Sequence, residues 1–559
     1  MKTSLHGFIF KNIFLLASLS GFAQWNSNPS INTPVCTAIG KQNDARMIDD
    51  DHHGAYVAWK DYRTGIPDIY IQRVDSLGYP LWTFNGVSLC NDPADQSTPS
   101  ITTDMKGGAI VTWSDWRSGI ERDIYAQRIT KNGIIKWTFN GAGVANKVER
   151  EHNEKIISDD NGGAIIAWEQ QDNINFWWDI WLQRIDSMGN PVWTVGGMPV
   201  GTIANYRLNP KIQKDGKGGV FLTWQEWGTN YDIYAQRIDK NGNRLWGANG
   251  ILACNAVGTQ MNPKIDPDSI TKGIVIAWQD ERNFIDYDIY AQRMDSMGNL
   301  LWGASGQPVI NFTGNQSAVD FLSNPKVGGS IFAWKDSRSG SFDIYAQRLD
   351  INGNQQWPVS GVVICNSIND QINPNVTGDG TGGAVVVWQD SSAGNWDVYS
   401  QRLDKNGNIL WASNGVPVGI ATGDQTSPKN ISDGYGGSIY SFQDKRSGTN
   451  DIYVHRIFNN GASVGVKDLN IVSEAECFPN PFEDKFELKF YLLKEEKISV
   501  RIYNSSGQLI SEPVIDKNMA AGNNSIKINT EENQLAEGVY FLELKGGDFS
   551  KQIKLIKVK

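Results

Sequence analysis

DIYAQRIDKNGNRLW, residues 232–246, contains a strand pattern, a tight turn and the start of a second strand. Its first half alternates apolar and polar residues and is rich in Ile and Tyr, which is typical of a β-strand. The pair Asn241-Gly242 accepts the positive φ angles of a tight hairpin turn. This stretch therefore predicts a β-hairpin.

Near-copies of the stretch recur along the chain. They include DIYIQRVDSLGYPLW from Asp68, DIYAQRMDSMGNLLW from Asp288 and DVYSQRLDKNGNILW from Asp397. An anchor tryptophan recurs every 54 to 56 residues, at Trp59, Trp113, Trp168, Trp224, Trp278, Trp334 and Trp388, with Phe442 in the eighth place. A fixed period of this kind indicates an array of similar supersecondary units.

Each repeat is predicted to contain four short strands. In residues 209–254 they are NPKIQKD, VFLTWQE, DIYAQRID and GILAC, separated by Gly-rich or polar turns. Four antiparallel strands in a unit of this length form the blade of a β-propeller. We therefore expect an all-β fold, with an eight-bladed β-propeller over residues 24–461.

The eighth repeat lacks its fourth strand, and the N-terminal segment supplies a candidate. WNSNPSINTPVC, residues 25–36, is similar to WASNGVPVG from Trp411. The N-terminal strand is thus expected to complete the last blade and close the ring, which removes exposed sheet edges. The alternative is an open solenoid with a frayed end.

The phrase Asp-x-x-Gly-x-x-x-Trp, as in DKNGNRLW from Asp239, resembles the repeats of quinoprotein-like eight-bladed propellers. The resemblance covers one short segment of each blade and supports the fold. Dehydrogenases of that superfamily typically use a vicinal cysteine pair and a calcium site. The five cysteines of this chain include no adjacent pair, so we expect no cofactor, and we expect no bound metal.

The N-terminus, MKTSLHGFIFKNIFLLASLSGFAQW, reads as a secretory signal peptide over residues 1–23. Its apolar run is too short to span a membrane, and small residues at Gly21 and Ala23 suit a cleavage site. A buried N-terminal helix is the alternative. No later segment is predicted to be a transmembrane helix, and the net charge of −10 argues against nucleic acid as a partner.

The Trp-rich repeat stops after residue 461, and a predicted linker over 462–475 leads to a different region at 476–559. This region contains IYNSSGQLI, GVYFLEL and, as the sorting motif, PNPF at Pro479, Asn480, Pro481 and Phe482. Together these motifs resemble the type IX secretion C-terminal sorting domain of Bacteroidota, and the strand pattern predicts a small β-sandwich. The resemblance implies the type IX secretion machinery as a partner and delivery to the outer-membrane surface. A carbohydrate-binding β-sandwich is the alternative.

One loop of most repeats carries the pattern Trp-x-Asp-x-Arg, as at Asp61 and Arg63 or Asp115 and Arg117. A residue repeated in several blades is not a unique catalytic group. We expect the Asp to accept hydrogen bonds within its turn and the Arg to bridge to the next blade. Binding of a polar ligand by these pairs is the alternative.

The same loop departs from the pattern in repeats three and four, which read WEQQDNINFWWDIW and WQEWGTNYD. Exposed aromatic rings beside carboxylates and amides suit sugars, whose apolar faces stack on the rings. Packing between blades is the alternative role. The predicted ligand-binding residues are Trp116, Trp177, Trp178, Glu226, Trp227 and Tyr231.

These observations predict a non-catalytic binding or adhesion protein of the cell surface, with a glycan or an extracellular protein as ligand, rather than an enzyme. No catalytic triad or phosphate loop can be assigned. One alternative is a polysaccharide hydrolase using Glu151, Glu169 or Glu226, because glycosidases need two carboxylates. The other is a structural surface protein without a discrete site.

Overall fold

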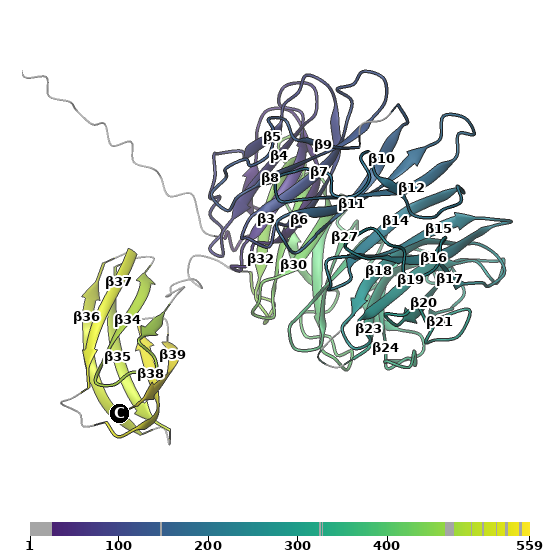
Figure 1. The fold of residues 1–559 in the computed structure, drawn as a ribbon. Helices are drawn as coiled ribbons and strands as arrows, with labels where there is room; N and C mark the ends of the chain where they lie inside the picture. Colours follow the sequence, from purple (N-terminus) through teal and green to yellow (C-terminus); the bar gives the residue numbers. More distant parts are fainter. Residues whose placement is uncertain are drawn as a thin grey trace, which may run out of the picture.

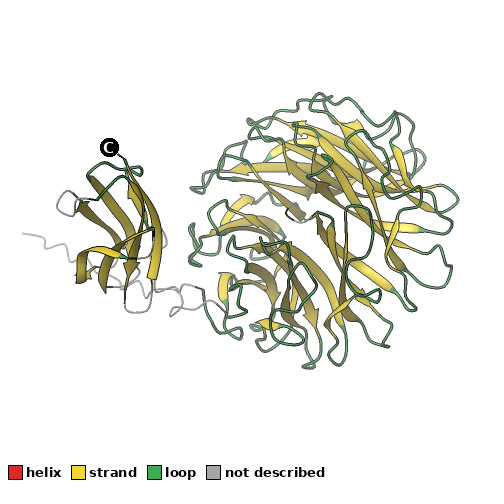
Figure 2. Ribbon diagram, turned by 90° about the horizontal axis from the view of Figure 1, so that it is seen from below, coloured by secondary structure: helices red, strands yellow, loops and turns green. Residues whose placement is uncertain are grey.

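The computed structural model describes residues 25–463, except 146–147, 324–325 and 327, and residues 475–558, except 493–494, 506–507, 521, 531–534 and 547–549. The predicted signal peptide and residues 464–474 of the predicted linker lie outside the described residues. Every regular element of the described chain is a β-strand (Figure 2). The prediction of an all-β protein is therefore confirmed.

Within the described part of residues 33–457, the strands form eight antiparallel sheets of four strands each. The first strands of the sheets are β2 (Gln42–Asp49), β6 (Gln96–Thr103), β10 (Glu151–Ser158), β14 (Arg207–Lys214), β18 (Gln260–Asp268), β22 (Gln316–Ser323), β26 (Gln371–Gly378) and β30 (Gln425–Ser432). The second strands are β3 (Ala55–Asp61), β7 (Ala109–Asp115), β11 (Ala164–Gln171), β15 (Val220–Trp227), β19 (Gly273–Asp280), β23 (Ser330–Asp336), β27 (Ala384–Asp390) and β31 (Ser438–Asp444).

The remaining strands complete each sheet on the side away from its first strand. The third strands are β4 (Asp68–Val74), β8 (Asp123–Ile129), β12 (Trp178–Ile185), β16 (Tyr231–Ile238), β20 (Asp288–Met294), β24 (Asp343–Leu349), β28 (Asp397–Leu403) and β32 (Asp451–Ile457). The fourth strands are β5 (Val87–Cys90), β9 (Ala142–Ala145), β13 (Met198–Pro199), β17 (Ile251–Cys254), β21 (Gln307–Ile310), β25 (Val362–Cys365), β29 (Val416–Gly419) and, in the eighth sheet, β1 (Thr33–Cys36).

The sheets follow one another in a closed succession. Each first strand contacts the first strands of the neighbouring sheets, and β30 of the eighth sheet contacts β2 of the first. β2 also contacts β31 and β32, and Figure 1 shows β30 and β32 of the eighth sheet, late in the chain, next to β3 of the first sheet. β1 pairs antiparallel with β32, with Thr33 opposite Val454 and Cys36 opposite Ile452.

Hydrophobic cores lie between adjacent sheets. Trp113 of the second sheet, for example, is fully buried in a cluster that includes Ile69 and Leu89 of the first sheet. The other anchor tryptophans are equally buried. Burial of large aromatic surface is a major source of stability, so the repeated tryptophan is a packing residue.

The repeated phrase at 232–246 makes hydrogen bonds within its sheet and to a neighbouring sheet. Gln236 Oε1 accepts from Trp246 N at 2.9 Å, and its Nε2 donates to Gly247 O at 2.7 Å, which fixes the hairpin. Arg237 pairs with Asp215 at 2.9 Å and donates to Ser296 O of the next sheet at 3.0 Å. The repeated segment therefore stabilises its own sheet and connects it to the next one.

The Trp-x-Asp-x-Arg loops also have a scaffold role. Asp115 accepts hydrogen bonds from Trp113 Nε1 at 2.8 Å and from Arg117 Nε at 2.9 Å, and Arg117 donates to Asn140 O at 2.8 Å. The Asp115 carboxylate is fully buried. The hydrogen bonds of this loop thus connect the second strand of the sheet, β7, to the turn that precedes its fourth strand, β9.

Asp115→Ala is expected to destabilise the second sheet strongly. It removes the carboxylate that the Arg117 guanidinium and the Trp113 indole N–H share, and breaking a partly buried ion pair of this kind costs about 3–5 kcal/mol. Denaturant unfolding followed by tryptophan fluorescence measures the change. The control is Asp160→Ala, because Asp160 pairs with Lys214 on the surface, where an ion pair contributes about 0–1 kcal/mol. Equal effects of the two substitutions would contradict the expectation.

The C-terminal region forms two further sheets around one apolar core. The three-stranded sheet contains β33 (Glu476–Phe478), β34 (Lys485–Leu492) and β37 (Gly522–Asn529). The four-stranded sheet contains β36 (Leu509–Met519), β35 (Glu496–Asn504), β38 (Gly538–Lys545) and β39 (Ser550–Lys557). Leu488 of one sheet and Leu542 of the other are fully buried in the shared cluster, as in a β-sandwich.

Candidate functional site

The largest departure from the repeat pattern produces an aromatic pocket. Its lining residues are Trp177, Asn205, Tyr206, Trp227 and Tyr231, and its volume is about 410 Å³. Trp177 immediately precedes β12 in the third sheet, whereas Trp227 ends β15 and Tyr231 begins β16 in the fourth sheet. The pocket thus lies where two adjacent sheets and their connection meet. It is called the aromatic pocket below.

Local hydrogen bonds hold the rings of the fourth sheet in place. Trp227 and Tyr231 are opposite each other in the β15–β16 ladder, and their rings meet edge to face with centroids 4.9 Å apart. The tight turn between them closes through Gly228 N donating to Asn230 O at 2.9 Å, and Trp227 N donates to Tyr206 O at 2.9 Å. Tyr206 is therefore fixed to the loop that presents Trp227.

Glu226 lies beneath the pocket rather than in its lining. It is buried and takes the position of the repeated Asp, accepting from Trp224 Nε1 at 2.9 Å. Its other contacts are Arg207 Nε at 2.7 Å and Asn205 Nδ2 at 2.7 Å. These three donors hold the Glu226 carboxylate inside the fold, so it is not part of the exposed surface, and its role in ligand binding stays a prediction.

Trp178 and Trp116 are near the same sector but not among the pocket lining. Trp178 is half-buried and packs on His152, with ring centroids 4.2 Å apart. Trp116 lies in the loop of the second sheet with 37% of its surface exposed, and the Arg122 guanidinium lies 5.8 Å from its ring centroid. Three of the six predicted residues, Trp177, Trp227 and Tyr231, therefore share the pocket.

Asn205 and Tyr206 were not predicted from the sequence. They lie in the connection before β14, where several repeats carry Asp-Gln and this one carries Tyr206-Arg207. Arg207 is buried and joins Glu226 to Asp179 of the third sheet, with Nη1 2.9 Å from Asp179 Oδ1. The replacement of Asp-Gln by Tyr206-Arg207 in this repeat is the sequence feature that could have indicated Asn205 and Tyr206 as site residues.

Glu169 and His152 form a second polar group close to the start of β14. Glu169 is buried and accepts from Asn153 Nδ2 at 2.7 Å and from Asn209 N at 2.6 Å, while His152 Nδ1 lies 3.4 Å from its Oε2. Burial raises the pKa of Glu169. Burial and the positive charges of Arg150, Lys155 and Arg122 lower the pKa of His152 to about 4. Near neutral pH the imidazole is therefore uncharged.

The third carboxyl weighed from the sequence, Glu151, begins β10 and is fully buried at the position that Gln42 occupies in the first sheet. It lies outside the pocket lining. Within the described residues, no group of three or more His, Cys, Asp or Glu side chains is arranged to hold a metal ion. No helix in the described chain is long and apolar enough to span a membrane.

The sorting motif is built into the C-terminal core. Phe482 is fully buried against Phe486, with ring centroids 4.8 Å apart. Asn480 Nδ2 donates to Lys554 O at 2.7 Å, and its Oδ1 accepts from Ile556 N at 2.9 Å. The motif thus fastens the beginning of this region to its last strand, β39.

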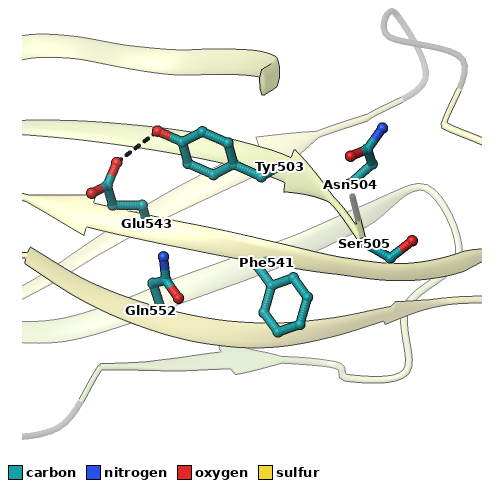
Figure 3. Close-up of a pocket in the computed structure, with 6 residues that line it drawn as sticks. All are labelled: Tyr503, Asn504, Ser505, Phe541, Glu543 and Gln552. Carbon is teal, nitrogen blue, oxygen red and sulfur yellow. Dashed lines mark hydrogen bonds between the residues drawn. The ribbon is translucent and has the colours of Figure 1, made fainter. Parts of the chain in front are cut away.

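A surface hollow of about 310 Å³ lies on the four-stranded sheet of the C-terminal region (Figure 3). Figure 3 shows Tyr503 and Glu543 joined by a hydrogen bond of 2.9 Å. The lining residues are Tyr503, Asn504, Ser505, Phe541, Glu543 and Gln552. This hollow is more polar than the aromatic pocket.

Solved structures to which the chain has a weak similarity include enzymes that act on arabinose-containing glycans. The endo-arabinase from Bacteroides thetaiotaomicron is 13% identical, with a TM-score of 0.28, over 44% of this chain and 92% of that chain. The α-L-arabinanase of Penicillium chrysogenum is 14% identical, with a TM-score of 0.33, over 56% and 94%. The α-L-arabinofuranosidase of Fusarium graminearum is 12% identical, with a TM-score of 0.33, over 56% and 94%. No curated protein matches the chain.

These neighbours overturn the prediction that the protein is not an enzyme. That prediction treated a propeller-like array without a recognisable catalytic motif as non-catalytic, whereas the named neighbours are enzymes. At this level of identity the likeness concerns the fold, and no substrate is transferred from them.

Residues 476–559 match the family described as the secretion system C-terminal sorting domain. This is the region that the sequence analysis identified through PNPF and the two later motifs. The prediction of a type IX sorting domain and of surface localisation is therefore confirmed. The chain carries the signal by which Bacteroidota secrete proteins through the type IX machinery to the cell surface or outer membrane.

Proposed function

We propose that the protein is a carbohydrate-active enzyme of the cell surface, a hydrolase that holds its glycan in the aromatic pocket. The observation that carries the proposal is the composition of that pocket. Trp177 and Trp227 expose 49% and 47% of their surface beside Asn205, Tyr206 and Tyr231. Aromatic faces next to hydroxyl and amide groups suit the alternating apolar and polar surface of a sugar.

The size of the pocket favours a glycan over an extracellular protein. Its volume of about 410 Å³ falls in the range of about 300–1,000 Å³ that is typical of small-molecule sites. A protein partner usually buries a broad surface instead. An oligosaccharide inserted between the Trp177 and Trp227 rings therefore fits better.

Two carboxyl groups bond to the beginning of β14, the strand that follows Asn205 and Tyr206 of the pocket lining. Glu226 bonds to Arg207, and Glu169 accepts from the backbone of Asn209 two residues later. Glycoside hydrolysis needs one protonated and one ionised carboxyl group. Because burial raises the pKa of Glu169, we assign it the general acid role. Glu226, which accepts from Arg207 and from Asn205 of the pocket lining, is the second carboxyl group that we propose.

Glu169→Gln is expected to lower turnover of a cleavable oligosaccharide by about 100-fold or more, since general acid catalysis contributes about 10²–10⁴. Binding is expected to stay within a few fold. Release of reducing sugar from a panel of polysaccharides provides the substrate and the rate. In the wild type, the rate should fall as pH rises through the raised pKa of Glu169.

The control is Glu154→Gln. Glu154 is also buried on β10 and its pKa is also raised by burial, but it bonds to Thr98 and Ser114 of the second sheet. Turnover by this variant should remain close to wild type. Equal loss in both variants, or none in Glu169→Gln, would refute the assignment of Glu169.

We also propose that the eight sheets are the blades of one propeller over residues 24–461, followed by a linker over 462–475 and the sorting domain over 476–559. The closed succession of first strands and the β1–β32 pairing support it. The likeness to quinoprotein-like repeats enters this proposal for the fold alone, without a quinone cofactor.

A further inference from the structure

One position of the first strands carries a charged residue in most sheets. It directly follows a β-bulge, and its register is the same throughout: Arg46 lies opposite Ala58, Lys155 opposite Ala167 and Lys211 opposite Thr223. The eight residues at this position, called the cationic ring below, are Arg46, Ser100, Lys155, Lys211, Lys264, Asp320, Asn375 and Lys429.

The ring residues influence each other across non-adjacent sheets. Burial is the main cause that lowers the pKa of Lys155 of the third sheet. Glu154 and Glu169 oppose this shift, whereas the charges of Arg46 of the first sheet and Lys264 of the fifth add to it. Burial, Arg46 and Lys264 also lower the pKa of Lys429 of the eighth sheet to about 8. Because the first strands contact one another in a closed succession, these side chains meet at its centre.

The cations of the ring have few acidic partners. Lys264 Nζ lies 3.1 Å from Asp320 Oδ1, and this is the ring's one ion pair within 4.0 Å among the described residues. The other oxygen of Asp320 accepts from Asn375 Nδ2 at 2.6 Å. Lys155 Nζ donates to Asn153 Oδ1 at 2.6 Å, and Lys211 Nζ to Pro210 O at 3.5 Å. Among the described residues, most cations of the ring therefore have no carboxylate within ion-pair distance.

Three further carboxyl groups lie near the ring, and burial disfavours their ionised form. Burial raises the pKa of Glu154 and of Glu169, and it raises that of Asp266 to about 7. The ring lysines and Arg46 remain partly exposed, so solvent reaches them. Like charges gathered in this way destabilise the folded protein unless an anion joins them.

We propose that the cationic ring binds the carboxylate or sulfate groups of an acidic polysaccharide. Cations on several sheets that converge on one centre can contact one polyanion at the same time, through charge-assisted hydrogen bonds. The inference rests on the proposed function and extends it, because it names the chemical class of the glycan.

Strand β14 connects the two sites. It begins next to Asn205 and Tyr206 of the aromatic pocket and carries Lys211 of the ring. Six residues of extended strand span about 20 Å. A glycan long enough to cover this distance lies with neutral faces on the pocket rings and an acidic group at the ring.

The test compares two oligosaccharides of equal length on the purified full-length protein. The probes are an oligogalacturonate, which carries carboxylates, and a neutral galactan oligosaccharide, each titrated by calorimetry at pH 6.5. We expect the oligogalacturonate to bind at least about tenfold more tightly at low salt, and the difference to shrink at high salt as the charges are screened. Equal affinities at low salt would overturn the proposal.

The double variant Lys211→Gln with Lys429→Gln is expected to remove that difference and to leave affinity for the neutral probe unchanged. The control is Lys214→Gln on the same strand, whose lysine pairs with Asp160 on the surface. Unchanged oligogalacturonate affinity in the double variant would overturn the proposal. Loss of neutral binding in Trp177→Ala would instead concern the aromatic pocket, so the two proposals fail separately.

Two further measurements separate the ring from a structural or adventitious role. The double variant should unfold at a higher temperature than wild type in the absence of ligand, since it relieves repulsion; a lower unfolding temperature would mark the lysines as scaffold. Inorganic sulfate at about 10 mM, a concentration that leaves screening modest, should displace little oligogalacturonate. Full displacement would reassign the ring to small free anions.

Discussion

A protein that ends at residue 463 is expected to be absent from the cell surface, whereas the full chain is present there. The reason is that residues 476–559 carry the sorting domain, and the type IX machinery needs that domain to pass its cargo across the outer membrane. The measurement is accessibility to an added protease on intact cells of a Bacteroidota host, with total protein determined after lysis.

A substitution inside the sorting domain is the matched test. Phe482→Asp places a charge where a ring is fully buried, and burial of an unpaired charge costs several kcal/mol. Surface exposure should be lost while the repeat region stays folded. Phe478→Asp is the control, because Phe478 precedes the motif and exposes 71% of its surface. Normal surface delivery of the Phe482→Asp protein would contradict the expectation.

Replacement of both pocket tryptophans, Trp177→Ala with Trp227→Ala, is expected to weaken glycan binding by about 100-fold or more. Truncation of a central aromatic contact commonly costs about 2 kcal/mol. The loss of two such contacts therefore exceeds the about 2.8 kcal/mol that corresponds to a 100-fold change in affinity. Calorimetric titration with the oligosaccharide found in the turnover screen measures the loss.

Trp116→Ala is the matched control for the tryptophan pair. Trp116 is exposed in the equivalent loop of the second sheet but does not line the aromatic pocket. Its loss should change affinity by less than about twofold. If Trp116→Ala weakens binding as much as the double variant, the glycan covers a wider surface than the pocket between the third and fourth sheets.

The fold could be predicted from the sequence because the residues that determine it recur along the chain. Seven of the eight repeats contain the same buried tryptophan and the same Gln-Arg pair, and the eighth has Phe442 and His455-Arg456 at these positions, so one hairpin at 232–246 predicted the whole array. Part of the pocket could be predicted from the sequence because Trp177, Trp227 and Tyr231 interrupt the regular pattern of the repeats. Asn205 and Tyr206 were missed because they lie in a connection whose length and composition vary between repeats.

The misplacement of Glu226 and the omission of the cationic ring have specific physical reasons. Glu226 is one methylene longer than the repeated Asp, yet it occupies the same hydrogen-bonding position and pairs with Arg207. The cationic ring was not predicted because a β-bulge precedes its position in every first strand. The alternation of inward and outward side chains along a regular strand therefore does not predict which side chains face the centre. Its residue types also differ between repeats, and only the register aligns Lys211 with Lys429.

The position of β32 determines how the repeat region resists mechanical load. A protein held to the cell by its C-terminal region is pulled through residue 463, shortly after β32 ends at Ile457. β32 is not an edge strand, because β1 pairs with it on one side and β31 on the other. Tension from flowing medium or from a tethered polymer therefore has to shear two hydrogen-bonded ladders together. An array whose last strand had one neighbour would instead unzip a single ladder.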